Sequence, residues 1–253
     1  MNHAILPTFI MRDPTPKSNP SGRVARPHDS AHLHVSGEAI YGDDIAEPRD
    51  LLHAHLRLAD RAHARVTRMD LSKVRAAPGV AAVICAQDLV ATTNDISPVF
   101  PGDVVFVDGE VHFHGQPLFA VAAESREAAR RAAMLAEIDY EDLPAILSIE
   151  DALAANAEVV PKKLWTRGDP DGAIARAPHR LSGRIKMGGQ EHFYLEGQNS
   201  MAIPQEDGQM LIYSSTQNPS ELQHKAAEVL GVPANAVTAE NRRMGGGFGG
   251  KET

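Results

Sequence analysis

A run of glycines near residue 250 constrains the fold of this chain more than any other sequence feature. Between Gly245 and Gly250, five of six consecutive residues are glycine and the sixth is Phe248. Glycine adopts positive φ angles readily and lets the backbone approach a bulky group closely. Its exposed N–H groups can converge on one anionic object, such as a phosphate or an oxyanion. We therefore expect a binding loop here, called the glycine loop below (residues 245–250), with the carboxylate of Glu252 close behind it.

Two phosphate-binding patterns fit the glycine loop incompletely. Gly245, Gly247 and Gly250 have the dinucleotide-binding spacing, but that fingerprint needs a following helix and an acidic residue about 20 positions later. Gly245 and Lys251 come within one residue of a P-loop, yet Glu252 stands where a hydroxyl would reach magnesium. A flexible glycine linker is the third interpretation. The motifs that precede the loop favour a fourth.

Three ordered segments carry a resemblance to one enzyme family. They are Gly-Gly-Gln-Glu-His-Phe-Tyr-Leu-Glu at 188–196, Ser-Thr-Gln-Asn-Pro at 215–219 and Arg-Met-Gly-Gly-Gly-Phe-Gly-Gly-Lys-Glu at 243–252. In this order they resemble the molybdenum-cofactor-binding subunit of bacterial xanthine dehydrogenases, in the xanthine oxidase and aldehyde oxidase family. Residues 27–31 and 37–44 are similar to the opening of that subunit. The resemblance covers roughly residues 27 to 253, and three ordered motifs are far more specific than one glycine run.

The resemblance assigns roles to five residues. In the family, the glutamine matching Gln217 hydrogen-bonds an oxygen ligand of molybdenum, and the backbone matching Gly247, Phe248 and Gly249 passes beside the metal. All four are thus expected cofactor contacts, with Gln217 and Phe248 nearest the metal. Glu252 matches the substrate-binding carboxylate, which can hold the ring N–H and carbonyl groups of a purine in one orientation. The general base and a purine-binding arginine are expected beyond residue 253, so no catalytic residue is assigned.

The residues around Gln217 point separately to a rigid corner. Asn218 can cap a helix, Pro219 suits its first position, Glu221 can reach back to the cap, and Gly231 can close the helix. Gln217 is then held just before a helix N-terminus, where negative charge is favoured and its amide could donate to an oxo ligand. The alternative is an ordinary polar residue in a turn, and the family resemblance decides between them.

The resemblance implies a molybdenum hydroxylase that converts hypoxanthine and xanthine to urate in purine catabolism. Electrons would pass through [2Fe-2S] clusters and FAD on a partner subunit to NAD. Cys85 is the single cysteine, so this chain cannot supply the four thiolates of a cluster. We expect a hetero-oligomer with that iron–sulfur and FAD subunit. We also expect these residues to be the front portion of a longer subunit, inactive and unable to hold the cofactor tightly alone.

Other functions remain open at this point. A related molybdenum hydroxylase could act on aldehydes or other N-heterocycles, and Glu252 favours a purine. A non-catalytic fragment could merely dock the iron–sulfur and FAD subunit. A nucleotide-binding protein is the most distant alternative.

Composition limits the kinds of binding partner and the cellular location that are expected for the chain. The formal net charge is −8, with 25 basic and 33 acidic residues and no dense basic block, so nucleic acid is not expected as a partner. No apolar run approaches the 18 or more residues of a membrane span. Residues 1–20 lack the pattern of a signal peptide, which makes a cytoplasmic protein the default.

The expected fold class is α+β, in which an α/β hammerhead domain precedes the beginning of a mixed α/β molybdopterin-binding domain. Prolines and polar residues at the start predict a disordered tail. The expected divisions are a tail at 1–26, the hammerhead domain at 27–145, a connecting segment at 146–178 and the truncated first part of the cofactor domain at 179–253.

Hydrophobic periodicity places the elements. Leu52, Ala54, Leu56 and Leu58 predict a strand with a polar face turned to solvent. Further strands are expected at 80–85 (more fully buried), 118–123, 181–187, 199–203 and 210–214, with a hairpin turn at 206–208. Helices are expected at 71–76, from the N-cap Ser125 to about 138 with Leu135 on its buried face, at 149–155, and after Asn218. Phe193 and Tyr194 are expected in the core, Cys85 is expected to pack as a small apolar residue, and Lys251 could pair with Glu252.

Histidines spaced two apart suggest metal binding. The pairs are His32 with His34, His53 with His55, and His112 with His114. On a strand each pair would share a face, but two imidazoles leave a tetrahedral site incomplete and thiolates are lacking. Ordinary surface histidines are the favoured interpretation.

Overall fold

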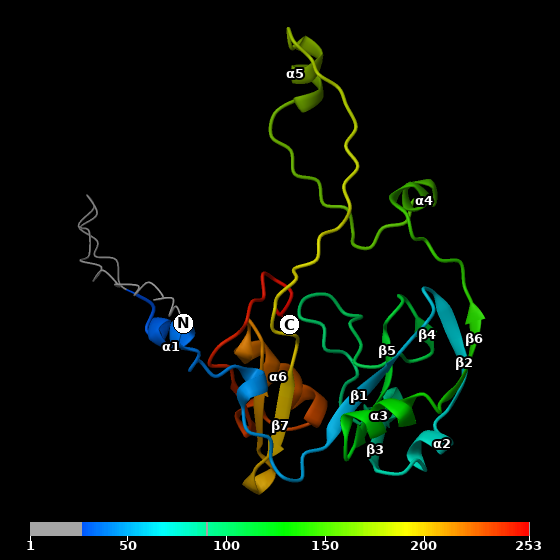
Figure 1. Ribbon diagram of the computed structural model, residues 1–253. Coiled ribbons are helices and arrows are strands. Elements are labelled where there is room, and N and C mark those ends of the chain that lie inside the picture. Colours follow the sequence, from blue (N-terminus) through cyan, green and yellow to red (C-terminus); the bar gives the residue numbers. More distant parts are fainter. Residues whose placement is uncertain (1–26, 90, 253) are drawn as a thin grey trace, which may run out of the picture.

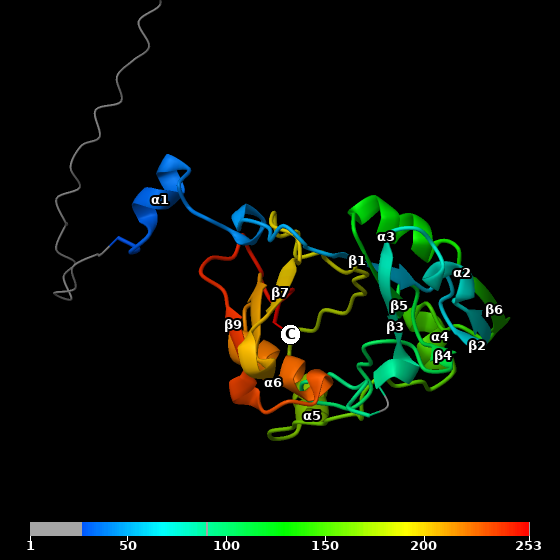
Figure 2. The same ribbon diagram turned by 90° about the horizontal axis from the view of Figure 1, so that it is seen from below.

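The computed structural model describes residues 27–89 and 91–252 (Figure 1). The expected disordered tail, residues 1–26, lies outside the described residues. A first unit, residues 53–142, and a second unit, residues 200–252, lie side by side in both views (Figure 1, Figure 2). A connecting segment, residues 143–199, leaves the first unit and reaches away from both before it returns (Figure 1). The architecture is the expected α+β arrangement of small sheets and few helices.

Two three-stranded antiparallel sheets form the first unit. One sheet has the order β1 (His53–Leu58), β5 (Pro117–Ala123), β3 (Val80–Cys85), and the other has the order β4 (Glu110–Val111), β2 (Ala64–Asp70), β6 (Glu137–Asp142). Helices α2 (Ser72–Arg75) and α3 (Arg126–Ala133) pack on the first of these sheets. The sequence predicted β1, β3, β5 and both helices, whereas β2, β4 and β6 were not predicted.

The buried face of β1 is the opposite of the expected one. Leu56 and Leu58 are 47% and 43% exposed, although they carry the apolar alternation of the strand. Arg57 lies opposite the fully buried Phe119 in the register with β5, and directly paired residues share a face of the sheet. The polar positions of β1 therefore face the core. Strand β3 is also less buried than expected, since Ile84 is 42% exposed.

Helix α3 begins as expected and ends early. The hydroxyl of Ser125 accepts an N–H of the first turn at 3.1 Å, as an N-cap does. The helix stops at Ala133 rather than near residue 138, because the residues that follow form β6 and pair with β2. Leu135 is consequently 46% exposed, and Ala129 takes part in the buried face instead.

The core of the first unit lies where α2 and α3 cover the β1-β5-β3 sheet. Cys85 belongs to it, as expected, and burial raises the pKa of its thiol. The fully buried apolar side chains that fill the space are Val74, Val111, Leu118, Phe119, Val121, Ala123, Ala129 and Ala133.

The second unit is a three-stranded sheet with one helix. Its order is β7 (Ser200–Pro204), β8 (Met210–Ser214), β9 (Val237–Glu240), with β8 and β9 parallel. Helix α6 (Pro219–Leu230) connects β8 to β9 and packs on β9. The sequence predicted β7, β8, their turn and α6, but not β9.

Capping fixes both ends of α6. Asn218 accepts the N–H of Glu221 at 3.2 Å, and its own amide donates to that carboxylate at 2.7 Å. Gly231 closes the helix with a φ of 68°. At 12 residues, α6 is the longest helix of the described chain, and no helix there is long and apolar enough to cross a membrane.

The connecting segment contains two short helices and long extended stretches. Helix α4 (Ile149–Ala154) was expected, and α5 (Pro170–Arg176) was not. The strand expected at 181–187 does not form, and Leu181 is 102% exposed. Phe193, expected in the core, is 79% exposed. A strand needs a hydrogen-bonded neighbour, and 181–187 has none among the described residues.

Residues before β1 contact the second unit. The Arg243 guanidinium donates to the carbonyl of Ile40 at 3.3 Å, and the N–H of Gly42 donates at 3.1 Å to Glu196, at the end of the connecting segment. A cavity of about 450 Å³ lies between residues 40–46 and the ends of β8 and β9. Helix α1 (Ala31–Ser36) lies beyond the second unit, far from the first (Figure 2). The second unit thus packs against residues that lie far from it in sequence.

Replacing Phe119 by alanine tests the core of the first unit. Removing this fully buried ring should lower the free energy of unfolding by about 3–5 kcal/mol, because lost burial and the cavity left behind add together. Phe113→Ala is the matched control: that ring is 55% exposed, and the loss should stay below about 1 kcal/mol. Urea denaturation followed by circular dichroism measures both, and equal losses would contradict this core.

Candidate cofactor site

Gln217 sits at the corner between β8 and α6, as expected. Its Oε1 accepts the backbone N–H groups of Gly249 at 2.9 Å and Lys251 at 3.2 Å. Its Nε2 donates to Oε2 of Glu252 at 3.2 Å, and its backbone N–H donates to the carbonyl of Lys251 at 2.7 Å. Because two N–H donors fix the oxygen side of the amide, the NH₂ group must point toward Glu252. The corner presents a donor of fixed direction.

The glycine loop wraps so closely around its neighbours that side chains are excluded. A Cβ on Gly247 would lie 2.7 Å from Cδ of Gln217, and one on Gly250 would lie 2.6 Å from Cε1 of Tyr194. Gly246 and Gly249 have φ angles of 103° and 93°, which side chains rarely permit. The sequence predicted both uses of glycine, close approach and positive φ.

Phe248 is the unusual member of the loop. Its φ is 55°, a left-handed conformation that strains a bulky residue, and its side chain is 76% exposed. Within the described residues, the N–H groups of Gly246, Gly247 and Phe248 engage no acceptor. The loop therefore offers three backbone donors beside the amide of Gln217.

A buried ion pair anchors both ends of the loop. Lys251 donates to Oε2 of Glu196 at 3.4 Å, and the two side chains are only 1% and 8% exposed. Lys251 also donates to Ser215 at 2.6 Å and lies 4.7 Å from the centre of the Tyr194 ring. The pairing of Lys251 with Glu252, one possibility that the sequence left open, does not form, because the lysine is buried against Glu196 while Glu252 is exposed.

Hydrogen bonds keep Glu196 ionised. Burial alone would raise the pKa of this carboxyl, but donors from the backbone of Gly245, the hydroxyl of Ser215 and the backbone of Gly42 outweigh burial and lower the pKa to about 2. The shortest of these bonds, from Gly245 and Ser215, are both 2.6 Å. The loop thus begins on the same carboxylate that binds the lysine at its end.

Sequence reasoning placed Gln217 and the loop together but missed the anchor. Glu196 lies within one of the recognised motifs, yet nothing local in the sequence marks its side chain as buried. Its partner Lys251 is 55 residues away, with a nearer carboxylate beside it. Only the folded backbone brings the two together.

Family models match both units of the chain. A model described as the aldehyde oxidase and xanthine dehydrogenase a/b hammerhead domain matches residues 36–144. A model described as the molybdopterin cofactor-binding domain matches residues 153–253. The chain belongs to the xanthine dehydrogenase and aldehyde oxidase family. The first unit is thus the core of its hammerhead domain, and the second unit lies in its molybdopterin-binding domain.

Sequence relatives within this family include xanthine dehydrogenases. The chain is 40% identical over 240 residues to the xanthine dehydrogenase of Drosophila subobscura, covering 94% of this chain and 18% of that protein. It is also 40% identical over 228 residues to the xanthine dehydrogenase/oxidase of Felis catus, covering 90% of this chain and 17% of that protein. The chain therefore spans less than a fifth of the length of these relatives.

Solved structures share the fold. The aldehyde oxidoreductase of Desulfovibrio gigas is 28% identical with a TM-score of 0.77, over 93% of this chain and 28% of that one. Quinoline 2-oxidoreductase from Pseudomonas putida 86 has a TM-score of 0.76 at 24% identity, over 88% of this chain and 30% of that one, and supports the fold alone.

The residues around Gln217 fit part of a molybdopterin site of this family. Backbone N–H groups and a neutral amide are donors suited to anionic oxygens. Gly247 packs directly against Gln217, where any Cβ would collide with that side chain, and so holds the loop beside the amide. The lysine nearby is neutralised by Glu196, so the donors that would meet the cofactor are dipoles rather than a free cation.

Replacing Glu196 by glutamine tests the anchor. At pH 7 the change should lower the free energy of unfolding by about 3 kcal/mol, because it leaves the buried Lys251 without a counter-charge. The folded pKa lies below the unfolded one, so this difference is complete above about pH 4.5 and shrinks as the pH falls toward about 2.

Glu191→Gln is the matched control, since its side chain is 76% exposed. Urea denaturation of the wild type and both variants at pH 7 and pH 3 gives the measurement. A difference between wild type and Glu196→Gln that did not narrow at pH 3 would contradict the anchoring role of the carboxylate.

Proposed function

We propose that this chain supplies part of the molybdenum-cofactor and substrate site of an enzyme that hydroxylates hypoxanthine and xanthine to urate. The observation that carries the proposal is the hydrogen bond of 3.2 Å between Gln217 and Glu252. It links the amide proposed to face the cofactor with the carboxylate proposed to face the purine. Identity of about 40% to xanthine dehydrogenases supports the choice of substrate.

Each side chain of the site has a defined task in this proposal. When bound, the molybdenum cofactor supplies an activated oxygen and accepts two electrons. Gln217 donates from Nε2, and the N–H groups of residues 246–248 add donors directed at anionic oxygen. Glu252 accepts a ring N–H of the purine and so holds the ring in one orientation. Gly247, lacking a Cβ, lets the loop backbone lie directly against Gln217.

Electron transfer requires groups that the described residues of this chain do not hold. Cys85 is buried, and its thiol donates to Asp88 at 3.2 Å, so it is no cluster ligand. We therefore place the [2Fe-2S] clusters and FAD on a partner subunit in a hetero-oligomer, with NAD as the final acceptor. The absence of any dense basic block in the sequence supports purine rather than nucleic acid as the partner.

An aldehyde hydroxylase is the second candidate. The likeness to the Desulfovibrio gigas aldehyde oxidoreductase supports it. A carboxylate at Glu252 favours the purine, because an aldehyde has no ring N–H for that carboxylate to bind.

Gln217→Ala tests the cofactor contact. In the enzyme purified with its partners, we expect loss of a donor at the cofactor to lower kcat by about 100-fold or more. Gln209→Ala is the control, because that side chain is exposed and outside the site. Molybdenum content is measured beside the rate with xanthine, so loss of the cofactor is distinguished from loss of chemistry. Unchanged molybdenum content and unchanged rate together would refute the role of Gln217.

Glu252→Ala separates purine from aldehyde as the substrate class. Loss of a charged hydrogen bond to the purine should lower kcat/KM for hypoxanthine by about 10- to 100-fold. The rate with an aromatic aldehyde should change little, because no contact to it is lost. An enzyme that oxidises aldehydes but never purines, before and after the substitution, would overturn the purine assignment and leave the family membership intact.

A further inference from the structure

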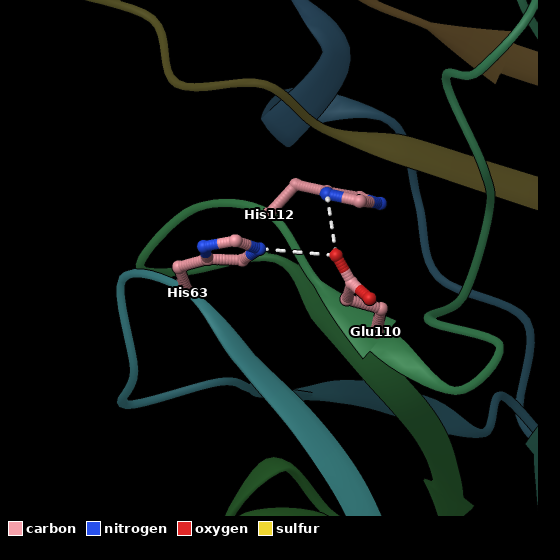
Figure 3. Close-up of side chains that lie close together, drawn as sticks. All are labelled: His63, Glu110 and His112. Atoms are coloured by element: carbon pink, nitrogen blue, oxygen red, sulfur yellow. Dashed lines mark hydrogen bonds and ion pairs between the residues drawn. The ribbon is translucent and has the colours of Figure 1, made fainter. Parts of the chain in front are cut away.

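Three side chains of the first unit converge at the edge of the β4-β2-β6 sheet. His63 precedes β2, Glu110 lies on β4 and His112 follows β4 (Figure 3). One ligand atom from each lies within 4.8 Å of the others. The pairing of Ala64 with Val111 in the β2–β4 register brings them together. This His63–Glu110–His112 cluster is not one of the histidine pairs considered from the sequence.

The geometry is that of a site for a small cation. Nε2 of His63 lies 3.0 Å and Nδ1 of His112 lies 3.8 Å from the same oxygen, Oε1 of Glu110. Ligands of a tetrahedral zinc ion, bound at 2.0–2.1 Å, lie about 3.3 Å apart. Both nitrogen–oxygen distances are therefore close to the spacing between two ligands of one zinc ion. Figure 3 shows both rings turned toward that oxygen.

A backbone carbonyl fixes the orientation of His63. Its Nδ1 lies 2.7 Å from the carbonyl of Pro144, which can only accept, so Nδ1 carries a proton. In the neutral ring, Nε2 then has its lone pair directed toward Glu110 and His112. Histidines that bind metals commonly donate their other ring N–H to such a partner.

Charge favours a cation at this point. The two imidazole rings are stacked with centres 6.2 Å apart, so two protonated rings would repel each other across the one carboxylate. A divalent ion instead receives both nitrogen lone pairs and the carboxylate charge. Arg65 lies near, but Glu141 binds and neutralises it. His112 is 63% exposed, so solvent can fill the remaining coordination position.

We propose that His63, Glu110 and His112 form a binding site for a divalent transition-metal cation of the Zn²⁺ type. Two imidazoles and one carboxylate suit zinc and its neighbours, whereas Mg²⁺ and Ca²⁺ require mainly oxygen ligands. The ion would join the start of β2 to β4, and through His63 to the backbone at Pro144, where the connecting segment leaves the first unit. Its role is to stabilise this edge of the hammerhead domain by cross-linking the two strands.

Zinc binding by the 253-residue chain tests the site. Equilibrium dialysis with Zn²⁺ alone should show one equivalent that His112→Ala and Glu110→Gln each bind more than about 100-fold more weakly, since even an outer partner of a ligand is worth 10- to 100-fold. His114→Ala is the matched control: it removes an exposed histidine two residues away that lies outside the cluster. Mg²⁺ at the same concentration should not bind.

A second measurement tests whether the bound ion stabilises the fold. Zn²⁺ should raise the melting temperature of the wild type and of His114→Ala, because a ligand that binds only the folded state stabilises it. It should not raise that of His112→Ala, whose fold is verified by circular dichroism. No zinc uptake by the wild type, or equal affinity and equal thermal shift in wild type and both cluster variants, would overturn the proposal.

Discussion

The buried ion pair between Glu196 and Lys251 is the interaction on which the site in the second unit depends. Burying such a pair costs desolvation energy, so the pair is a weak source of stability by itself. Its main effect is to hold the glycine loop in position. Glu196 accepts the N–H of Gly245 and Lys251 follows the loop directly, so the pair fixes both ends of a stretch with almost no side chains of its own. A loop of glycines has little packing to hold it, and these anchors replace packing.

The same carboxylate joins a third part of the chain. Gly42 donates to Oε1 of Glu196 while Gly245 and Ser215 donate to Oε2, so both oxygens are in use. One buried charge thus collects segments that lie about 150 residues apart in sequence. Both oxygens of a buried carboxylate need hydrogen-bond donors, because burying an unpaired carboxylate costs several kcal/mol of folding free energy. The arrangement therefore forms as a whole, which is why residues 40–46 lie against the second unit.

Local signals were sufficient to predict much of the fold and of the site. The caps at Ser125 and Asn218 and the turn at 206–208 depend on neighbours within four residues, and all three formed as expected. The position of Gln217 followed from the same cap. Strands β5 and β8 were predicted from short apolar runs.

Predictions failed where the structure of a segment depends on a residue far away in the sequence. Alternation along β1 gives the period of a strand but not which face is buried, and the register with β5 places Arg57 opposite Phe119. Residues 181–187 were predicted to form a strand, yet they pair with no neighbour among the described residues. His63 and Glu110 are 47 residues apart, so no sequence spacing could indicate their cluster.

The strain at Phe248 argues that the glycine loop is shaped for something other than its own stability. A left-handed phenylalanine costs on the order of 1–3 kcal/mol, which a glycine there would avoid. Burial does not offset that cost, because the ring is 76% exposed and lies back over Gly246, 3.2 Å from where a Cβ would be. Among the described residues, the N–H groups of Phe248 and its two preceding glycines donate to no acceptor. Backbone donors held at such a cost, next to an amide of fixed direction, are what a preorganised cofactor site requires.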